Sequence, residues 1–209
     1  MRVLHLYLGL VFFLFAGQVF AQDWVQYGNL TDRFSINFPS EPTITETTYL
    51  SEYRADIPSR IYATRQGESR YSLTVVDYTE TERFHQERSA RVGDRVRGDD
   101  LPGDIMGSIA YAAWNIRKRG GDITYDAWTQ FDRIAGHQLQ ITNDDQGRTY
   151  VQVLSHAERL YILEAIAAPG ATPPIHFQQS IRIIDEDGAP IRYDRDLRTR
   201  LDIEESVSP

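Results

Sequence analysis

The fold is decided by the stretch from Arg148 to Ala167, RTYVQVLSHAERLYILEAIA. Val, Tyr, Ile and Leu fill both of its arms, so it predicts two β-strands joined by a tight turn at His156–Arg159. In the second arm apolar side chains point to both faces, with Leu160, Ile162 and Ile166 on one and Tyr161, Leu163 and Ala165 on the other. A strand that is apolar on both faces is covered on both sides, which makes it a central strand.

The segments before this hairpin predict further strands. Phe34, Ile36 and Phe38 alternate with polar residues, which is typical of a strand buried on one face, over residues 32–38. Residues 44–53 are rich in Thr and Tyr and poor in large aliphatic residues, which indicates an edge strand. Two further runs form a predicted hairpin, and they are residues 59–65 and 71–78.

Helical signals interrupt the strands. Thr79 to Glu82 matches a capping box and predicts a helix to about Val96. Residues 104–119 predict a second helix, whose apolar stripe consists of Ile105, Ile109, Ala112 and Ile116. Strands follow at 123–133 and 138–142. Thr172 and Pro173 then begin a last predicted helix, and the residues expected to dock it are Phe177, Ile181 and Ile184.

This order of elements predicts an α+β fold, with an antiparallel sheet of about seven strands and helices packed on it. Residues 1–21 are expected to be a signal peptide and residues 22–184 a single domain. Residues 185–209 are charged and sparsely apolar, and are expected to form a flexible tail.

The start of the chain predicts export. Arg2 precedes an apolar run, and Val19-Phe20-Ala21 has the small residues of a cleavage site, so the mature chain is expected to begin at Gln22. The alternative is a membrane anchor through residues 3–20, although this run is shorter than the ~20 apolar residues of a spanning helix. The expected location is the periplasm, with secretion as a second possibility and no membrane contact after cleavage.

Composition excludes several kinds of chemistry. The 209 residues contain no cysteine, so thiol catalysis and zinc–thiolate sites are impossible. The formal net charge is −8, and it becomes −9 without Arg2, because residues 1–21 contain no acid. An acidic chain is a poor general partner for nucleic acids or anionic membranes, so neither is expected as a partner.

Three motifs resemble a known family. They are RFSINFPSEP at residues 33–42, YILEA at residues 161–165 and FQQSI at residues 177–181, and they follow the predicted signal and Trp24. Together they resemble exported bacterial proteins of unknown function with a PsbP-like α/β/α sandwich. This resemblance implies a protein that binds or assembles with larger complexes rather than one that catalyses. None of the family's functional residues can be matched to this sequence.

Few residues suggest a catalytic or metal site. Four histidines follow the signal, and they are His85, His137, His156 and His176. They lie far apart in sequence, so the pattern favours surface or turn positions over a metal site, and no cofactor is expected. Two acidic turns, at Asn143–Asp145 and Asp185–Asp187, hold some of the oxygen ligands of a calcium loop but lack others, and they favour solvated turns.

The best candidate for a partner surface is a basic stripe. Arg88, Arg91 and Arg95 follow three- and four-residue spacing and share one face of the predicted helix. We therefore expect an exported, non-catalytic binding or assembly module whose partner is a protein or an envelope complex; the sequence leaves its oligomeric state open. The alternative is a hydrolase or metal-dependent enzyme with a site built from scattered His and Asp residues.

Overall fold

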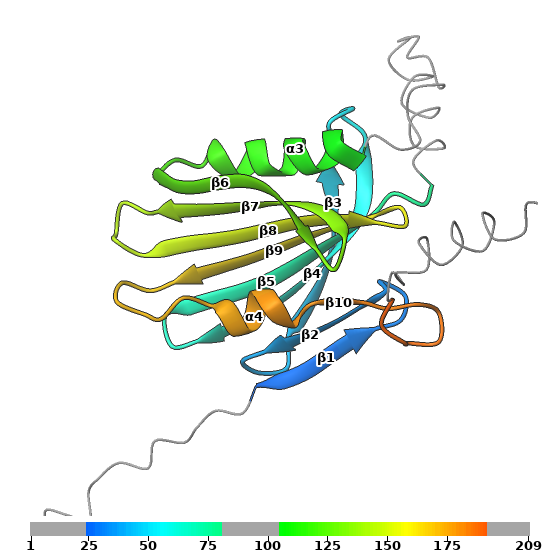
Figure 1. The fold of residues 1–209 in the computed structure, drawn as a ribbon, viewed down its shortest axis with the longest axis horizontal. Coiled ribbons are helices and arrows are strands. Elements are labelled where there is room, and N and C mark those ends of the chain that lie inside the picture. Colours follow the sequence, from blue (N-terminus) through cyan, green and yellow to red (C-terminus); the bar gives the residue numbers. More distant parts are fainter. Residues whose placement is uncertain (1–23, 81–104, 192–209) are drawn as a thin grey trace, which may run out of the picture.

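The structure, a computed structural model, describes residues 24–80 and 105–191. This part of the chain forms ten strands and two helices (Figure 1). In chain order they are β1 (Val25–Asn29), β2 (Phe34–Phe38), β3 (Thr43–Leu50), β4 (Asp56–Gln66), β5 (Ser69–Asp77), α3 (Ile105–Arg117), β6 (Asp122–Phe131), β7 (Ile134–Thr142), β8 (Arg148–His156), β9 (Arg159–Ala167), α4 (Ile175–Ser180) and β10 (Arg182–Ile183).

Seven strands form one antiparallel sheet in the order β3-β4-β5-β9-β8-β7-β6. The predicted hairpin at 148–167 is present as β8 and β9, and β9 is the middle strand of the sheet. Its side chains are covered on both faces, since Leu163 is fully buried and Ile162 is 8% exposed. The central position inferred from the two apolar faces is therefore confirmed.

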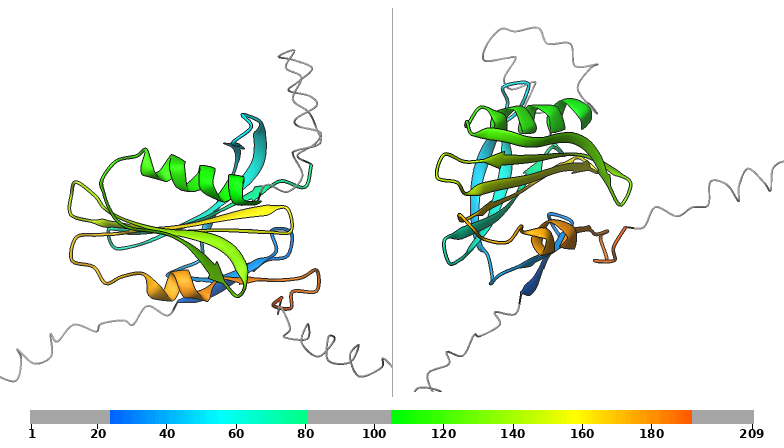
Figure 2. Two further views of the ribbon diagram at one scale, coloured as in Figure 1. Left: turned by 45° about the horizontal axis from the view of Figure 1, so that its top comes forward. Right: turned by 60° about the vertical axis from the view of Figure 1, so that its left-hand side comes forward.

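Two layers cover this sheet. Helix α3 contacts β7, β8 and β9 on one face, where Ile109, Ala112 and Ile116 are buried as the apolar stripe predicted. Helix α4 and the first strands lie on the other face, where Phe177 is fully buried. The left view of Figure 2 shows the sheet nearly edge-on between these two layers. The α+β class with a seven-stranded antiparallel sheet is confirmed.

A second, smaller sheet was not predicted. It consists of β1, β2 and β10, with β2 in the centre. Phe34, Ile36 and Phe38 are fully buried against the large sheet, so the alternating pattern identified the buried face of β2 correctly. The same pattern arises whether a strand belongs to the large sheet or packs on it, and it therefore did not reveal the second sheet.

Turn geometry changes three predicted boundaries. Strand β3 ends at Leu50 rather than residue 53, because the chain reverses through Arg54, which has a φ of 59°. Strand β7 begins at Ile134 rather than residue 138, directly after a two-residue turn. Helix α4 begins at Ile175 after Pro174, which makes no side-chain capping bond, so the predicted cap at Thr172 is wrong.

Residues 185–191 turn back onto the small sheet. Gly188 has a φ of 85°, and the Ile191 N–H donates to the Ile183 carbonyl at 2.9 Å. The predicted signal peptide, most of the helix expected up to Val96 and the rest of the tail lie outside the described residues. The domain limits therefore stay predictions. In the described ranges no helix is both long and apolar enough to cross a membrane.

Candidate binding surface

A cluster of charged side chains joins the end of α3 to the edge strand β6. The Arg117 guanidinium donates to both carboxylate oxygens of Asp126, with Nε and Nη2 each at 2.6 Å from an oxygen. His137 on β7 lies beside this pair, with its Nε2 at 2.6 Å from Asp126 Oδ1. Trp128, opposite His137 in the strand ladder, packs its ring edge-on at 4.9 Å from the imidazole. The cluster therefore fixes α3 against the outer two strands.

The cluster is an ion pair with one buried imidazole. The hydrogen bonds from Arg117 are the main reason that the pKa of Asp126 lies below its ordinary value, and the contact with His137 lowers it further. Asp126 in turn raises the pKa of Arg117. The second ring nitrogen of His137, Nδ1, is buried and has no hydrogen-bond partner in the described part of the chain. The buried imidazole therefore holds its place through Nε2, which lies against the carboxylate of Asp126.

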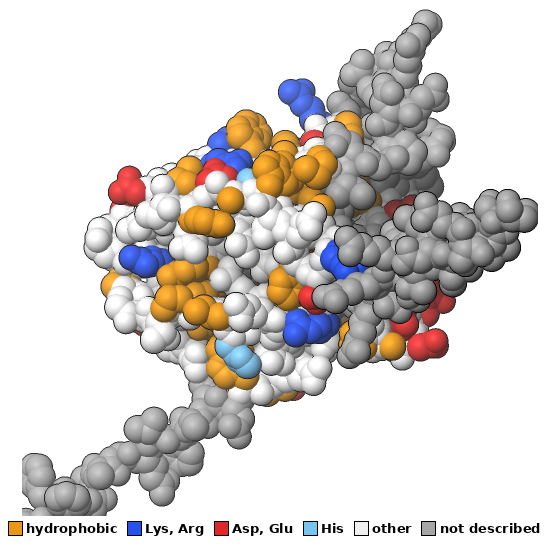
Figure 3. Space-filling model, viewed as in Figure 1, with side chains coloured by type: hydrophobic (Ala, Val, Ile, Leu, Met, Phe, Trp, Pro, Cys, Tyr) orange, Lys and Arg blue, Asp and Glu red, His pale blue; other side chains and the backbone are white. Residues whose placement is uncertain are grey.

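Exposed apolar side chains surround this cluster. Trp114 on α3 is 49% exposed, Trp128 is 50% exposed and Ile123 is 46% exposed. The ammonium of Lys118 lies 3.6 Å from the centre of the Trp114 ring. Figure 3 shows hydrophobic, basic and acidic side chains gathered where α3 and β6 lie. We call these four residues, together with the cluster beneath them, the α3–β6 surface.

The α3–β6 surface has the composition of a protein-binding site. Trp and Arg are the residues most enriched among side chains that dominate interface affinity, and exposed aromatic rings bind best when their neighbours hold them still. Trp128 is held by the His137 ring, and Trp114 by Lys118. The outer edge of β6 also contains a register shift between Ile123 and Tyr125, and such a bulge disfavours simple strand addition.

The predicted basic stripe is a separate candidate for a partner surface. Arg88, Arg91 and Arg95 lie outside the residues that the structure describes, and the stripe stays a prediction. His85 lies there as well.

The remaining histidines occupy separate sites. His137 belongs to the α3–β6 surface, whereas His156 ends β8 at the turn into β9, where burial lowers its pKa. His176 lies on α4, with its Nε2 at 3.3 Å from the Asn37 side-chain amide and its ring beside Trp24. Within residues 24–80 and 105–191 no three His, Asp or Glu side chains are grouped to hold a metal ion.

The two acidic turns use their oxygens for the backbone. Asp185 Oδ1 accepts from the N–H groups of Asp187 and Ala189, at 3.0 Å and 2.8 Å. Asp145 Oδ1 accepts from the Gly147 N–H at 2.8 Å, and Asn143 Oδ1 accepts from the Thr149 hydroxyl at 3.0 Å. These hydrogen bonds explain why Asp and Asn occur at both turns.

Sequence reasoning missed the α3–β6 surface for an identifiable reason. Simple alternation over residues 123–133 groups Tyr125, Ala127, Thr129 and Phe131 on one face of the predicted strand. Ile123, Asp126 and Trp128 lie on the other face of β6, on the side of the sheet that α3 covers. A tryptophan and an isoleucine flanking an acid on an edge strand were a usable signal, but the Arg117 partner depends on the tertiary packing of α3.

Comparisons with known proteins concern the fold. No family model matches the sequence. No curated protein matches it either. Among solved structures, the chain is similar to the solution structure of cyanobacterial PsbP (CyanoP) from Synechocystis sp. PCC 6803, at 10% identity and a TM-score of 0.45. The similarity covers 80% of this chain and 96% of that chain.

Proposed function

We propose that this protein is an exported, non-catalytic binding module of the periplasm that contacts a protein partner through its α3–β6 surface. The observation that carries the proposal is the pair of half-exposed tryptophans, Trp114 and Trp128, beside a hydrogen-bonded ionic cluster. Large aromatic side chains that are exposed to solvent contribute little to the stability of a monomer. They contribute strongly to binding when a partner covers them.

The charges of the surface indicate the chemistry of the partner. Arg117 and Asp126 neutralise each other, whereas Lys118 has no ion pair within the described residues and lies over Trp114. A complementary protein surface therefore has an apolar centre that covers Trp128 and a carboxylate near Lys118. The acidic net charge of the chain makes this basic edge distinctive.

The alternative, a hydrolase or metal-dependent enzyme built on scattered histidines, has less support. It needs His137, His156 or His176 to converge in one cleft. These residues lie on β7, at the end of β8 and on α4, and each makes different contacts. No specific observation favours a reaction at any of them.

The proposal can be tested by photo-crosslinking in the native envelope at native protein levels. A photoreactive phenylalanine analogue at position 114 is expected to capture one defined partner. The same analogue at position 44, where Ile44 is also 46% exposed but lies on the opposite edge strand, is expected to capture none. Equal capture from both positions would contradict the proposal.

Affinity for the captured partner gives a second measurement. Trp128→Ala is expected to weaken binding by at least about thirtyfold, since a central tryptophan typically contributes 2 kcal/mol or more. Ile44→Ser is the matched control and is expected to leave binding unchanged. If the triple variant Arg88/Arg91/Arg95→Glu releases the partner while Trp128→Ala does not, the basic stripe rather than the α3–β6 surface is the binding site.

A further inference from the structure

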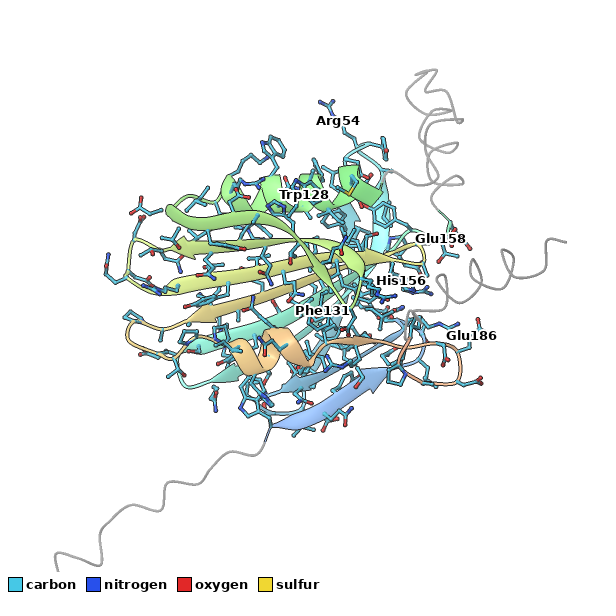
Figure 4. The ribbon with its side chains drawn as sticks, in the orientation of Figure 1. Arg54, Trp128, Phe131, His156, Glu158 and Glu186 are labelled. Carbon is cyan, nitrogen blue, oxygen red and sulfur yellow. The ribbon has the colours of Figure 1, made fainter. Side chains whose placement is uncertain are left out.

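A pocket lies at the C-terminal end of β6, beside Phe131. It has a volume of about 470 Å³ and lies between the β6–β7 turn and the segment that contains β10. Figure 4 labels Phe131 at this place, close to α4 and β10. The lining residues are Phe131, Asp132, Arg133, Ile134, Ile181, Arg182, Ile183, Pro190 and Ile191. A pocket of this size accommodates a small organic ligand.

The floor of the pocket is apolar and fixed. Ile134, Ile181 and Ile183 are 6%, 0% and 5% exposed, so they belong to the core and present only one side to the pocket. Phe131 is partly buried and packs against the same core cluster. A ligand that covers this floor must have an apolar body of its own, because no polar side chain rises from it.

The wall of the pocket contains a guanidinium group held in one orientation. Arg182 Nη1 donates to the carbonyls of Gln179 and Ile181, at 2.9 Å and 2.7 Å, which are the free carbonyls at the end of α4. Its guanidinium carbon lies 5.8 Å from the centre of the Phe131 ring. Both hydrogens of Nη1 are thereby used. Nε and Nη2 have no partner among the described residues.

The free edge of Arg182 has the geometry of a carboxylate receptor. Nε–H and Nη2–H are parallel donors, spaced to hold the two oxygens of one carboxylate. The rim adds Arg133, which is also positive, and Asp132, which is negative, so the lining has a net charge of +1. Asp132 weakens the attraction for an anion without cancelling it.

We infer that this pocket binds a small monocarboxylate with a flat apolar body, whose carboxylate pairs with the Nε–Nη2 edge of Arg182 and whose body lies on the isoleucine floor beside Phe131. The site is separate from the α3–β6 surface, and the two can be tested independently. The pocket binds this ligand without making or breaking a bond.

The probe for the test is 4-phenylbutyrate, and the purified protein retains its segment beyond residue 191. Calorimetry is expected to detect binding at least tenfold tighter than that of the uncharged 4-phenylbutan-1-ol. The Nε–H resonance of Arg182 is expected to shift on titration. Absence of binding at millimolar probe, or equal binding of acid and alcohol, would overturn the inference.

Four variants refine the test. Arg182→Lys keeps the positive charge but lacks the two parallel N–H donors of the guanidinium. This variant is expected to bind the acid at least tenfold more weakly. Asp132→Asn removes the opposing charge in a left-handed turn that Asn tolerates, and is expected to strengthen binding two- to threefold. Phe131→Leu is expected to weaken binding severalfold. Arg65→Gln, on an exposed arginine far from the pocket, is the control, and an equal loss in this variant would also overturn the inference.

Discussion

At the scale of single residues, the most demanding side chain is Asp32. It is 1% exposed, and a buried carboxylate must be fully paired to be tolerated. Arg60 donates to both of its oxygens, and the Tyr62 hydroxyl donates to Oδ2 at 2.5 Å. Burial and this hydrogen bond raise the pKa of Tyr62, which stays a neutral donor at any physiological pH. The Tyr161 hydroxyl donates to the backbone carbonyl of Asp32, which connects β9 to the start of β2.

We expect Asp32→Asn to lower the free energy of unfolding by about 3–5 kcal/mol, because the buried side of Arg60 loses its counter-charge. Urea denaturation at pH 7 measures the change. The control is Arg33→Gln, which breaks the neighbouring Arg33–Glu186 pair, and it is expected to cost only about 0–1 kcal/mol because that pair is solvent-exposed. Similar losses of unfolding free energy in both variants would show that the burial of Asp32 does not set the size of the effect.

At the scale of elements, the two-residue turns are unusual. Such hairpin turns require positive φ at both central residues and usually contain Asn or Gly. Here the β6–β7 turn uses Asp132 and Arg133, and the β8–β9 turn uses Ala157 and Glu158, with φ of 45° and 60° in the second. Both hairpins therefore retain their short loops despite backbone strain, because the long apolar strands determine the register.

We expect Glu158→Gly to raise the free energy of unfolding by about 1 kcal/mol, because glycine adopts this left-handed conformation without strain. Glu158 is exposed, and the bond from the Tyr78 N–H to its carbonyl does not involve the side chain. The opposite change, Gly67→Ala, is the matched test: its φ is 59° and an added Cβ meets no atom within 4 Å. This variant is expected to lose about 1 kcal/mol by the same argument. Thermal unfolding of both variants measures the two changes in unfolding free energy. Changes of the same sign would contradict this explanation by backbone strain.

Element by element, the sequence was informative where periodicity was strong. The β8–β9 hairpin, the β4–β5 hairpin and the buried stripe of α3 all follow from residue patterns. The start of β7 was missed because Asp132-Arg133 contains no turn glycine. The start of α4 was missed because Thr172-Pro173 has the residues of a cap, whereas the helix begins two residues later with no side-chain cap.

At the scale of the whole molecule, some features depend on contacts between distant segments. The separate sheet of β1, β2 and β10 joins residues from both ends of the described chain, and no local pattern encodes that choice. The pocket beside Arg182 likewise depends on where the β6–β7 turn packs. Only part of the α3–β6 surface can be predicted from the sequence. Trp114 and Trp128 stand out as large aromatic residues, but the sequence does not show that they lie on the same side of the sheet.

The predicted export of the molecule has a direct test. When the gene is expressed in a Gram-negative host, the N-terminal residue of the periplasmic protein is expected to be Gln22, as determined by intact mass. Ala21→Asp is expected to block cleavage, because signal peptidases require a small residue at this position. Gln22→Glu, one residue past the site, is the control. An uncleaved wild-type protein would favour the anchor through residues 3–20.

The pairing of β5 with β9 has a consequence for when the protein can fold. Leu73 lies opposite Leu163 in the middle of the large sheet, although the two residues are far apart in the chain. The centre of the sheet therefore cannot close until the chain is available as far as β9, and such long-range closure is slow. For the export proposed above, this delay keeps the polypeptide extended for longer, which is the form that a secretion channel passes.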